Sequence, residues 1–308
     1  MQPETIYTSL PAANDTYYQP FARALNHLNS TLQTRAAHAD HFTTITKRPV
    51  SFTTTKFNYP DIWLRDVAPV ITTRMVKFRY QPSYLKRRDA QYLDHRFNQF
   101  LKSRYHYHRS ALILDGGNVQ WNGSDTVILT TQVRHDNPTW SQKAIVVELK
   151  RQLAVQHVVF ISPEPGDVLG HADGMVRFNG RRQLFINDFK EEPGFLATVQ
   201  RQIRQQLPNV TFITLPSAYT SRGQYDSQIA SAKGLYINML ATHHALYVPQ
   251  YGLKTDRTAL ELIAAHTKQR VIPVNVGKIS TLGGSLHCLT WDVPSHQFDR
   301  SRSWLRFW

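Results

Sequence analysis

Four short segments of the chain carry residue types from which an active site could be built. They read WLRDVAP at 63–69, DGGN at 115–118, DVLGHADG at 167–174 and GGSLHC at 283–288. Each has an ordinary explanation when taken alone, because a single cysteine is usually a small buried apolar residue and Asp-Gly-Gly-Asn is a good turn sequence. Together they supply a thiol, an imidazole, several carboxylates and paired glycines, and the combination indicates a catalytic site.

Cys288 is the only cysteine of the chain, so no disulfide can form within it. A lone thiol with a histidine and a carboxylate elsewhere in the sequence is a candidate nucleophile with its base. His171 is the candidate base. Glycines lie close to both residues, including Gly284 near the cysteine, and glycine lets the backbone approach a ligand closely.

Several carboxylates accompany the thiol and the imidazole. They are Asp66, Asp115, Asp167 and Asp173. A cysteine protease needs no such set, whereas carboxylates around a thiol suit a cationic substrate. Paired, charge-assisted hydrogen bonds from carboxylates fit a planar cation, and a guanidinium group is the planar cation that matches. The residues therefore indicate chemistry on a guanidinium carbon.

The elements that position these segments recur as a unit of an amphipathic helix, a short connection and a β-rich run. Apolar residues at spacings of three and four predict the helices, and β-branched runs predict the strands. Four helical stripes are Phe21-Leu25-Leu28-Leu32, Leu93-Phe97-Leu101, Ile145-Leu149-Leu153 and Leu196-Val199-Ile203-Leu207, and a fifth helix runs from about Asp256 through Leu260 and Ile263 to His266. The strands begin near 41, 111, 157, 210 and 270. Five such units predict an α/β fold, either one doubly wound sheet or five small blades arranged radially.

The order of the segments resembles that of the agmatine deiminase and bacterial peptidylarginine deiminase family. WLRDVAP is similar to the family's Trp-x-Arg-Asp-x-Gly-Pro, with Ala68 in the glycine place, and LDGGNVQWNG to its Glu-Gly-Gly segment, with Asp115 one methylene shorter than Glu. GHADG, the GLYINMLATHHALYVPQYG stretch and the terminal LGGSLHCLTWDVP complete the similarity from about residue 61 to 294. The resemblance implies a five-bladed α/β propeller with pseudo-fivefold symmetry, formed by residues 1–308 as one deiminase domain.

The resemblance also implies roles for the site residues. Cys288 matches the nucleophile, His171 the general acid–base, and Asp66 and Asp173 the carboxylates that grip the guanidinium nitrogens. The positions expected to bind substrate are Trp63 as an aromatic wall, Asp115 and Asp167 as further acidic positions, and Gly284 beside the cysteine. The implied reaction releases ammonia and a ureido product through a covalent thiouronium intermediate.

A small guanidine is the expected partner, with agmatine favoured over peptidyl-arginine and free arginine. An arginine enzyme should supply a cation for the substrate carboxylate, and an agmatine enzyme an acid or carbonyls for the amine. No metal or organic cofactor is expected, because His243-His244 and His287-Cys288 lack the usual ligand spacings of zinc sites. Assembly into a homo-oligomer is left open.

The composition sets the remaining expectations. With 308 residues and 41% hydrophobic residues, the chain can bury a sizeable core; it has no run long enough for a membrane span and no visible signal peptide, which favours a cytoplasmic location. The net charge of +14 supports a second hypothesis, a catalytically idle protein that binds nucleic acid or acidic protein. Basic residues concentrate at 86–88 and 300–306, and aromatics interleave with them from Lys77 to Arg109, where they could stack on bases.

Overall fold

The computed structural model describes residues 3–218, 220–294 and 298–300. Its longer helices are α1 (Ala22–Arg35), α3 (Arg87–Lys102), α5 (Gln142–Leu153), α6 (Phe195–Gln206) and α7 (Thr255–His266); α2 (Leu64–Val67) and α4 (Gln132–Asp136) are short. Four 3₁₀ turns are η1 (Gln19–Phe21), η2 (Gly116–Asn118), η3 (Ala172–Gly174) and η4 (Ile279–Leu282). No helix among the described residues is long and apolar enough to cross a membrane.

The strands of the described residues form five separate sheets. Four have three strands: β4 (Val70–Ile71), β5 (Met75–Arg79) and β6 (His108–Ile113); β7 (Gln120–Trp121), β8 (Thr126–Thr130) and β9 (His157–Ile161); β10 (Val176–Phe178), β11 (Gln183–Asn187) and β12 (Thr211–Leu215); β13 (Leu240–Ala241), β14 (Ala245–Gln250) and β15 (Arg270–Asn275). The fifth has the order β16 (Trp291–Pro294), β1 (Glu4–Ser9), β2 (Asp40–Thr46) and β3 (Thr54–Lys56). The α/β class is confirmed, and the alternative of one doubly wound sheet is wrong.

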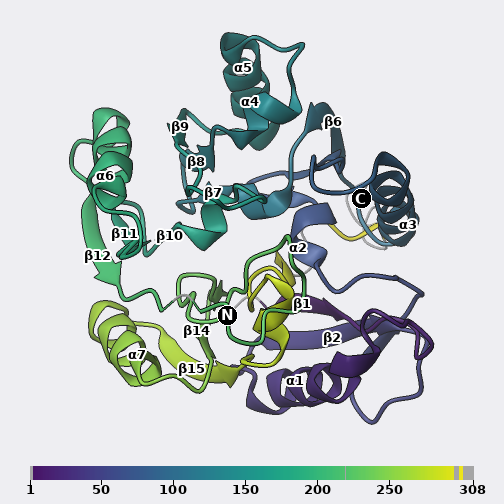
Figure 1. Cartoon of the computed structure of the whole chain (residues 1–308). Coiled ribbons are helices and arrows are strands. Elements are labelled where there is room, and N and C mark those ends of the chain that lie inside the picture. Colours follow the sequence, from purple (N-terminus) through teal and green to yellow (C-terminus); the bar gives the residue numbers. More distant parts are fainter. Residues whose placement is uncertain (1–2, 219, 295–297, 301–308) are drawn as a thin grey trace.

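Each sheet repeats one arrangement of its three main strands. The central strand pairs antiparallel with one neighbour and parallel with the strand that follows a long helix, as β5 does with β4 and β6. In the fifth sheet, the antiparallel neighbour of β1 is β16 from the other end of the chain. The five predicted helix-and-strand units are therefore confirmed in their order and approximate bounds. In Figure 1 the five long helices lie on the outside of the molecule and the sheets lie further in.

The helical stripes predicted from spacing do face the core. In α1, Leu25, Leu28 and Leu32 are all buried, as residues three and four apart share one helix face. Local signals set some boundaries: the Ser141 side chain accepts a hydrogen bond from the backbone N of Ala144 and begins α5, a normal N-cap contact. Helices and sheets thus pack through apolar faces, and the polar connecting turns carry the candidate site.

The basic and aromatic stretch from Lys77 to Arg109 does not present a row of rings to solvent. Five of its eight aromatic side chains are buried in the core, namely Phe78, Tyr80, Phe97, Phe100 and Tyr105. Lys77 itself is buried and paired with Asp94. These rings cannot stack on bases without unpacking the fold. Of the other basic segment, residues 300–306, only Arg300 lies within the described residues.

Candidate active site

Three of the four segments line two adjoining cavities although they are far apart in the sequence, and the fourth, 115–118, contacts His171 and Asp66 from behind. A cavity of about 920 Å³ is lined by Trp63, Asp66, Gly284 and Cys288 among others. A second cavity of about 480 Å³ is lined by Asp167, His171 and Asp173, and again by Gly284 and Cys288. Cys288 therefore lies on the wall that the two cavities share. None of these side chains lies in a long helix. They lie in or next to short elements, namely α2, η3 and the loop after η4.

Asn238 holds the thiol in place. Its Nδ2 donates to Cys288 Sγ at 3.2 Å, and its Oδ1 accepts from the backbone N of His287 and of Cys288 at 3.1 and 3.3 Å. Cys288 Sγ also lies 3.6 Å from Asp173 Oδ2. The cysteine is 7% exposed. Asn238 was not predicted as a site residue; it lies in a stretch that the sequence marked as family-like, without any signal for a role.

His171 lies between two carboxylates. Its Nε2 is 3.1 Å from Asp115 Oδ2, and its Nδ1 is 3.4 Å from Asp66 Oδ1. Burial disfavours the imidazolium, but the charges of Asp66 and Asp115 outweigh it and raise the pKa of His171 to about 10. An opposite charge within a few ångströms favours the charged form in this way. His171 is thus an imidazolium at neutral pH and holds a proton that it can give to a leaving group.

Asp66 and Asp173 are buried near the thiol but differ in their electrostatics. Burial raises the pKa of Asp66 to about 7, with further contributions from Asp115 and Asp173, although the His171 charge opposes the shift. Burial also acts on Asp173, but a 2.6 Å hydrogen bond from His287 Nδ1, together with nearby positive charges, lowers its pKa. One carboxylate is therefore poised to titrate, and the other stays ionised.

His287 positions Asp173. This role of His287 was not predicted from the sequence. Burial, together with the Arg65 charge, lowers the pKa of His287 to about 4 despite its contact with Asp173. A neutral imidazole can still donate from Nδ1, and its partner Asp173 is 2% exposed. Sequence reasoning had weighed His287 only as a metal ligand beside Cys288.

At two positions only glycine fits, because a neighbouring side chain lies too close to the main chain for a Cβ atom. A Cβ at Gly284 would lie 2.3 Å from Cζ3 of Trp63, and a Cβ at Gly117 would lie 2.5 Å from Asp66 Oδ1. The backbone N of Gly117 also donates to that oxygen at 3.2 Å. Gly284 therefore lets the Trp63 ring pack flat beside Cys288, and Gly117 lets the main chain reach Asp66.

Asp115 lies behind the cavity walls, whereas Asp167 lies at the edge of the second cavity. Asp115 Oδ2 accepts from Tyr84 OH at 3.0 Å and contacts His171, so it orients the imidazole. The two oxygens of Asp167 accept from the backbone N of Leu169 and of Gly170 at 2.9 and 3.0 Å, which fixes the loop before His171. The structure thus brings Asp115 to the histidine, while the Asp167 carboxylate faces its own loop at the edge of the second cavity.

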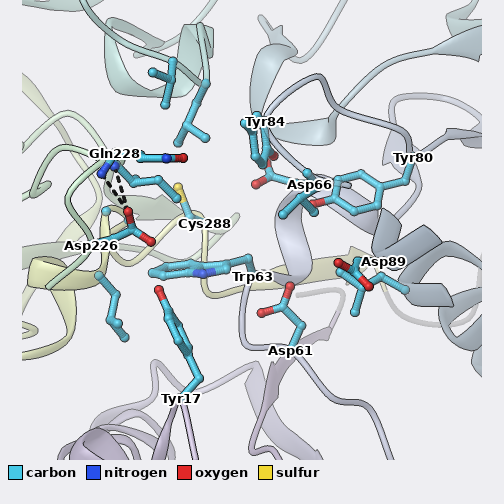
Figure 2. A pocket seen from close by; sticks show the side chains of 18 of the residues that line it. Tyr17, Asp61, Trp63, Asp66, Tyr80, Tyr84, Asp89, Asp226, Gln228 and Cys288 are labelled. Carbon is cyan, nitrogen blue, oxygen red and sulfur yellow. Dashed lines mark hydrogen bonds between the residues drawn. The ribbon is translucent and has the colours of Figure 1, made fainter. Parts of the chain in front are cut away.

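The outer part of the larger cavity is strongly acidic and aromatic (Figure 2). Besides Asp66, the carboxylates that line it are Asp15, Asp61, Asp89 and Asp226, and the rings are Tyr17, Tyr18, Trp63, Tyr80, Tyr84 and Tyr92. No lysine, arginine or histidine is among the described residues that line it. Although the chain carries a net charge of +14, this cavity is suited to a cation. Sequence reasoning missed these outer acids, because nothing in their local sequence separates them from surface residues.

We expect Cys288 of the free protein to react slowly with iodoacetamide at neutral pH. Burial, with the charges of Asp173 and Asp66, raises the pKa of this thiol well above its usual value, and only the thiolate is nucleophilic. Below that pKa the thiolate fraction rises about tenfold per pH unit, so the alkylation rate should climb from pH 7 to pH 9. Rates followed by mass spectrometry test this; a rate that reaches a plateau below pH 8 would show a thiol already ionised.

Comparison with known proteins places the chain among deiminases. A family model described as Porphyromonas-type peptidyl-arginine deiminase matches residues 2–294. An Enterococcus faecalis protein named "Putative agmatine deiminase" is 26% identical over 219 residues, which cover 61% of this chain and 59% of that protein. The chain thus spans less than two thirds of the length of this curated relative.

Solved structures share the fold. An agmatine deiminase of Enterococcus faecalis superposes with a TM-score of 0.74 at 18% identity, over 95% of this chain and 94% of the other. The agmatine deiminase of C. jejuni gives a TM-score of 0.75 at 17% identity, with coverage of 95% and 94%. At such identities the likeness establishes the fold, and the chemistry has to be argued from the side chains.

Proposed function

This chain belongs to the Porphyromonas-type peptidyl-arginine deiminase family, and we propose that it hydrolyses a guanidinium group with Cys288 as the nucleophile. One observation carries the proposal: the lone thiol lies on the wall between an acidic cavity that includes Asp66 and a cavity that holds His171 and Asp173. No step of the proposed reaction uses a metal ion or an organic cofactor.

In the first step the carboxylates prepare the substrate carbon. Asp66 and Asp173 accept hydrogen bonds from the guanidinium nitrogens, localise its delocalised charge and hold the carbon near the thiol, which is mainly an orientation effect. The bound cation also offsets the negative charges that keep the thiol protonated, because an adjacent positive charge favours the thiolate. Cys288 loses its proton to solvent, and the thiolate attacks the carbon; a C–S bond forms and the guanidinium becomes a neutral tetrahedral adduct.

In the second step His171 moves protons. It donates one to the departing nitrogen, so the C–N bond breaks and ammonia leaves a thiouronium attached to Cys288. The neutral imidazole then accepts a proton from water as the water attacks the same carbon, which is general acid–base catalysis. The C–S bond breaks, the thiol is restored and the ureido product leaves. One water is consumed for each ammonia released.

Agmatine is the substrate that the outer cavity supports best. Its amine would lie among Asp15, Asp61 and Asp226, with aromatic rings around its aliphatic chain. Free arginine would place a carboxylate there, and no basic side chain among the described lining residues offers it a partner. Peptidyl-arginine would place an uncharged backbone there, so it gains least from these acids. Free arginine and peptidyl-arginine remain the alternatives.

We expect agmatine to give the highest kcat/KM of three guanidines offered at equal concentration. Agmatine, arginine and a blocked arginine peptide share the reacting group and differ at the far end, where the acids should favour an amine by at least about tenfold, or ~1.4 kcal/mol. Ureido product is measured for each, with butylguanidine as a control that has no terminal charge. A peptide that outperforms agmatine would refute the small-guanidine assignment and direct attention to Asp115.

We also propose that the five sheets are the blades of a propeller with pseudo-fivefold symmetry, with the site near its axis. The repeated strand pairing and the outer position of the helices support this arrangement. The idle polyanion-binding alternative is less well supported, since the four catalytic candidates line joined cavities and the aromatics of 77–109 are mostly buried. A cytoplasmic location stays a prediction, and assembly into a homo-oligomer stays open.

A further inference from the structure

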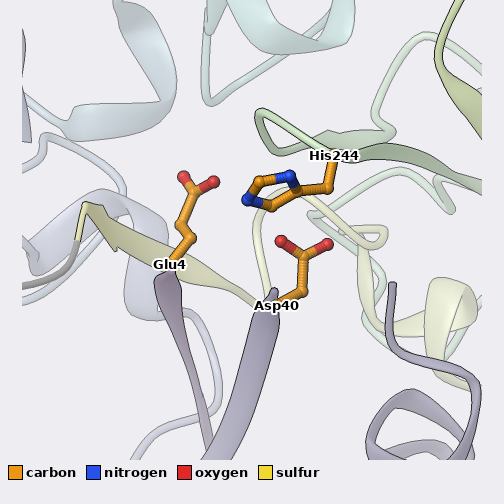
Figure 3. Close-up of side chains that lie close together, drawn as sticks. All are labelled: Glu4, Asp40 and His244. Carbon is orange, nitrogen blue, oxygen red and sulfur yellow. The ribbon is translucent and has the colours of Figure 1, made fainter. Parts of the chain in front are cut away.

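Three residues from distant parts of the chain bring metal-ligating atoms together away from Cys288 (Figure 3). Glu4 begins β1, Asp40 begins β2, and His244 lies in the turn between β13 and β14. One ligand atom from each lies within 4.8 Å of the other two. Glu4 and Asp40 are register partners in the parallel β1–β2 pair, so their side chains emerge next to each other. Figure 3 shows the imidazole beside the Glu4 carboxylate and above the Asp40 carboxylate.

The two carboxylates are buried side by side, and His243 forms an ion pair with Glu4. Glu4 and Asp40 are 2% and 3% exposed, and like charges on neighbouring strands repel each other. Glu4 Oε2 accepts from the backbone N and the ring Nδ1 of His243, at 3.0 and 3.2 Å. A buried cation would remove this repulsion.

Asp40 carries the most specific sign of a ligand. Its Oδ2 accepts from Thr242 Oγ1 at 2.9 Å and from Tyr247 OH at 2.7 Å. Its Oδ1 is buried and accepts no hydrogen bond among the described residues. A buried carboxylate oxygen without a partner is costly. One oxygen is thus held by donors, as outer-shell groups hold metal-binding carboxylates, and the other is left for an ion.

We propose that Glu4, Asp40 and His244 bind a divalent transition-metal ion of the zinc type. Imidazole with two carboxylates is a ligand set that Zn²⁺ accepts, with bonds of about 2.0–2.2 Å, and ligands of one ion then lie roughly 3–4 Å apart. Small side-chain rotations bring the three groups to that spacing. The ion plays a structural part, because it ties β1, β2 and the β13–β14 turn together.

Of the three proposed ligands, Glu4 faces a cavity other than the catalytic ones. Glu4 lines a cavity of about 450 Å³ together with Thr242, His243 and Asp292. The backbone N of His244 donates to Thr242 Oγ1 at 3.1 Å, and this contact fixes the turn that presents the imidazole. Sequence reasoning expected no metal because His243-His244 lacks zinc-ligand spacing; three ligands from three sheet elements leave no spacing signal in the sequence.

The test is a Zn²⁺ titration of the full chain by calorimetry after treatment with a chelator. It is done with Cys288→Ala, because zinc also binds thiolates and the catalytic thiol must not compete. We expect one equivalent of zinc per chain and a rise in melting temperature when zinc is added. His244→Ala should weaken binding at least tenfold and abolish the thermal shift, and Glu4→Gln should weaken binding in the same direction.

His41→Ala is the matched control, since His41 is an exposed histidine beside Asp40; it should bind zinc like the parent. The proposal is overturned if the parent binds no zinc, or if His244→Ala binds it with the stoichiometry and affinity of His41→Ala. Glu4→Gln provides an independent reading if His244→Ala is unstable without zinc. None of these outcomes bears on deimination, because the site does not include the catalytic residues.

Discussion

Replacing Cys288 by alanine is expected to abolish turnover while the protein stays folded. The thiol is the only candidate nucleophile of its kind in the chain, and no hydroxyl can take its place without a new base. The expected loss in kcat exceeds about 10³-fold, a barrier increase of ~4 kcal/mol. Steady-state ammonia release from agmatine measures it.

Ser285→Ala is a matched control for this change. Ser285 is a fully buried neighbour of Cys288 whose Oγ contacts Tyr251 OH at 2.7 Å, so the variant alters packing without removing the thiol. It should keep activity within about tenfold, and circular dichroism should show both variants folded. A Cys288→Ala variant with activity within about tenfold of the parent, or ~1.4 kcal/mol, would remove the covalent mechanism.

Asp66→Asn and Asp173→Asn are each expected to lose most of kcat/KM, by at least about 10²-fold. Truncating one partner of a buried, charged hydrogen-bonded pair costs ~2–5 kcal/mol, and each variant removes a charge that holds the guanidinium. Glu261→Gln is the matched control, because Glu261 is an exposed acid on α7 that pairs with Arg257 and lines neither cavity, so kcat/KM should change little. Near-normal kinetics in Asp66→Asn or Asp173→Asn would mean that guanidinium binding is assigned to the wrong carboxylate.

The pH dependence of activity in Asp66→Asn distinguishes an electrostatic role of Asp66 from a loss of packing. Asp66 is the largest of the charges that raise the pKa of His171, so Asp66→Asn should lower that pKa. The imidazolium, which exists below its pKa, would then be lost at a lower pH. The alkaline fall of the remaining activity should therefore move to lower pH in Asp66→Asn, whereas a purely structural defect would leave its position unchanged.

The sequence predicted the repeated units well, because helix and strand periods are local properties. The stripe Leu25, Leu28 and Leu32 faces the core as its spacing required. It also predicted several residues that line the two cavities with Cys288, namely Trp63, Asp66, His171 and Asp173, since each lies in a short segment with its own composition. The Trp63 ring beside Gly284 shows the limit, because the steric need for that glycine appears only when the two segments meet.

Other parts of the site depend on tertiary contacts and could not be predicted. Asn238 looks like an ordinary strand-flanking amide until its side chain is seen to hold Cys288. His287 stood next to the cysteine in sequence, yet it serves Asp173 through a 2.6 Å hydrogen bond. The outer acids and the Glu4, Asp40 and His244 cluster come from separate elements, so neither leaves a pattern along the chain.

The most direct test of the account is mass spectrometry of the protein quenched with acid during turnover of agmatine. We predict a population in which the peptide that contains Cys288 has gained the mass of agmatine minus ammonia, and ureido product and ammonia that accumulate in equal amounts. Cys288→Ala should show neither. Ureido product that forms while Cys288 stays unmodified at every quench time, with Cys288→Ala equally active, would contradict the account.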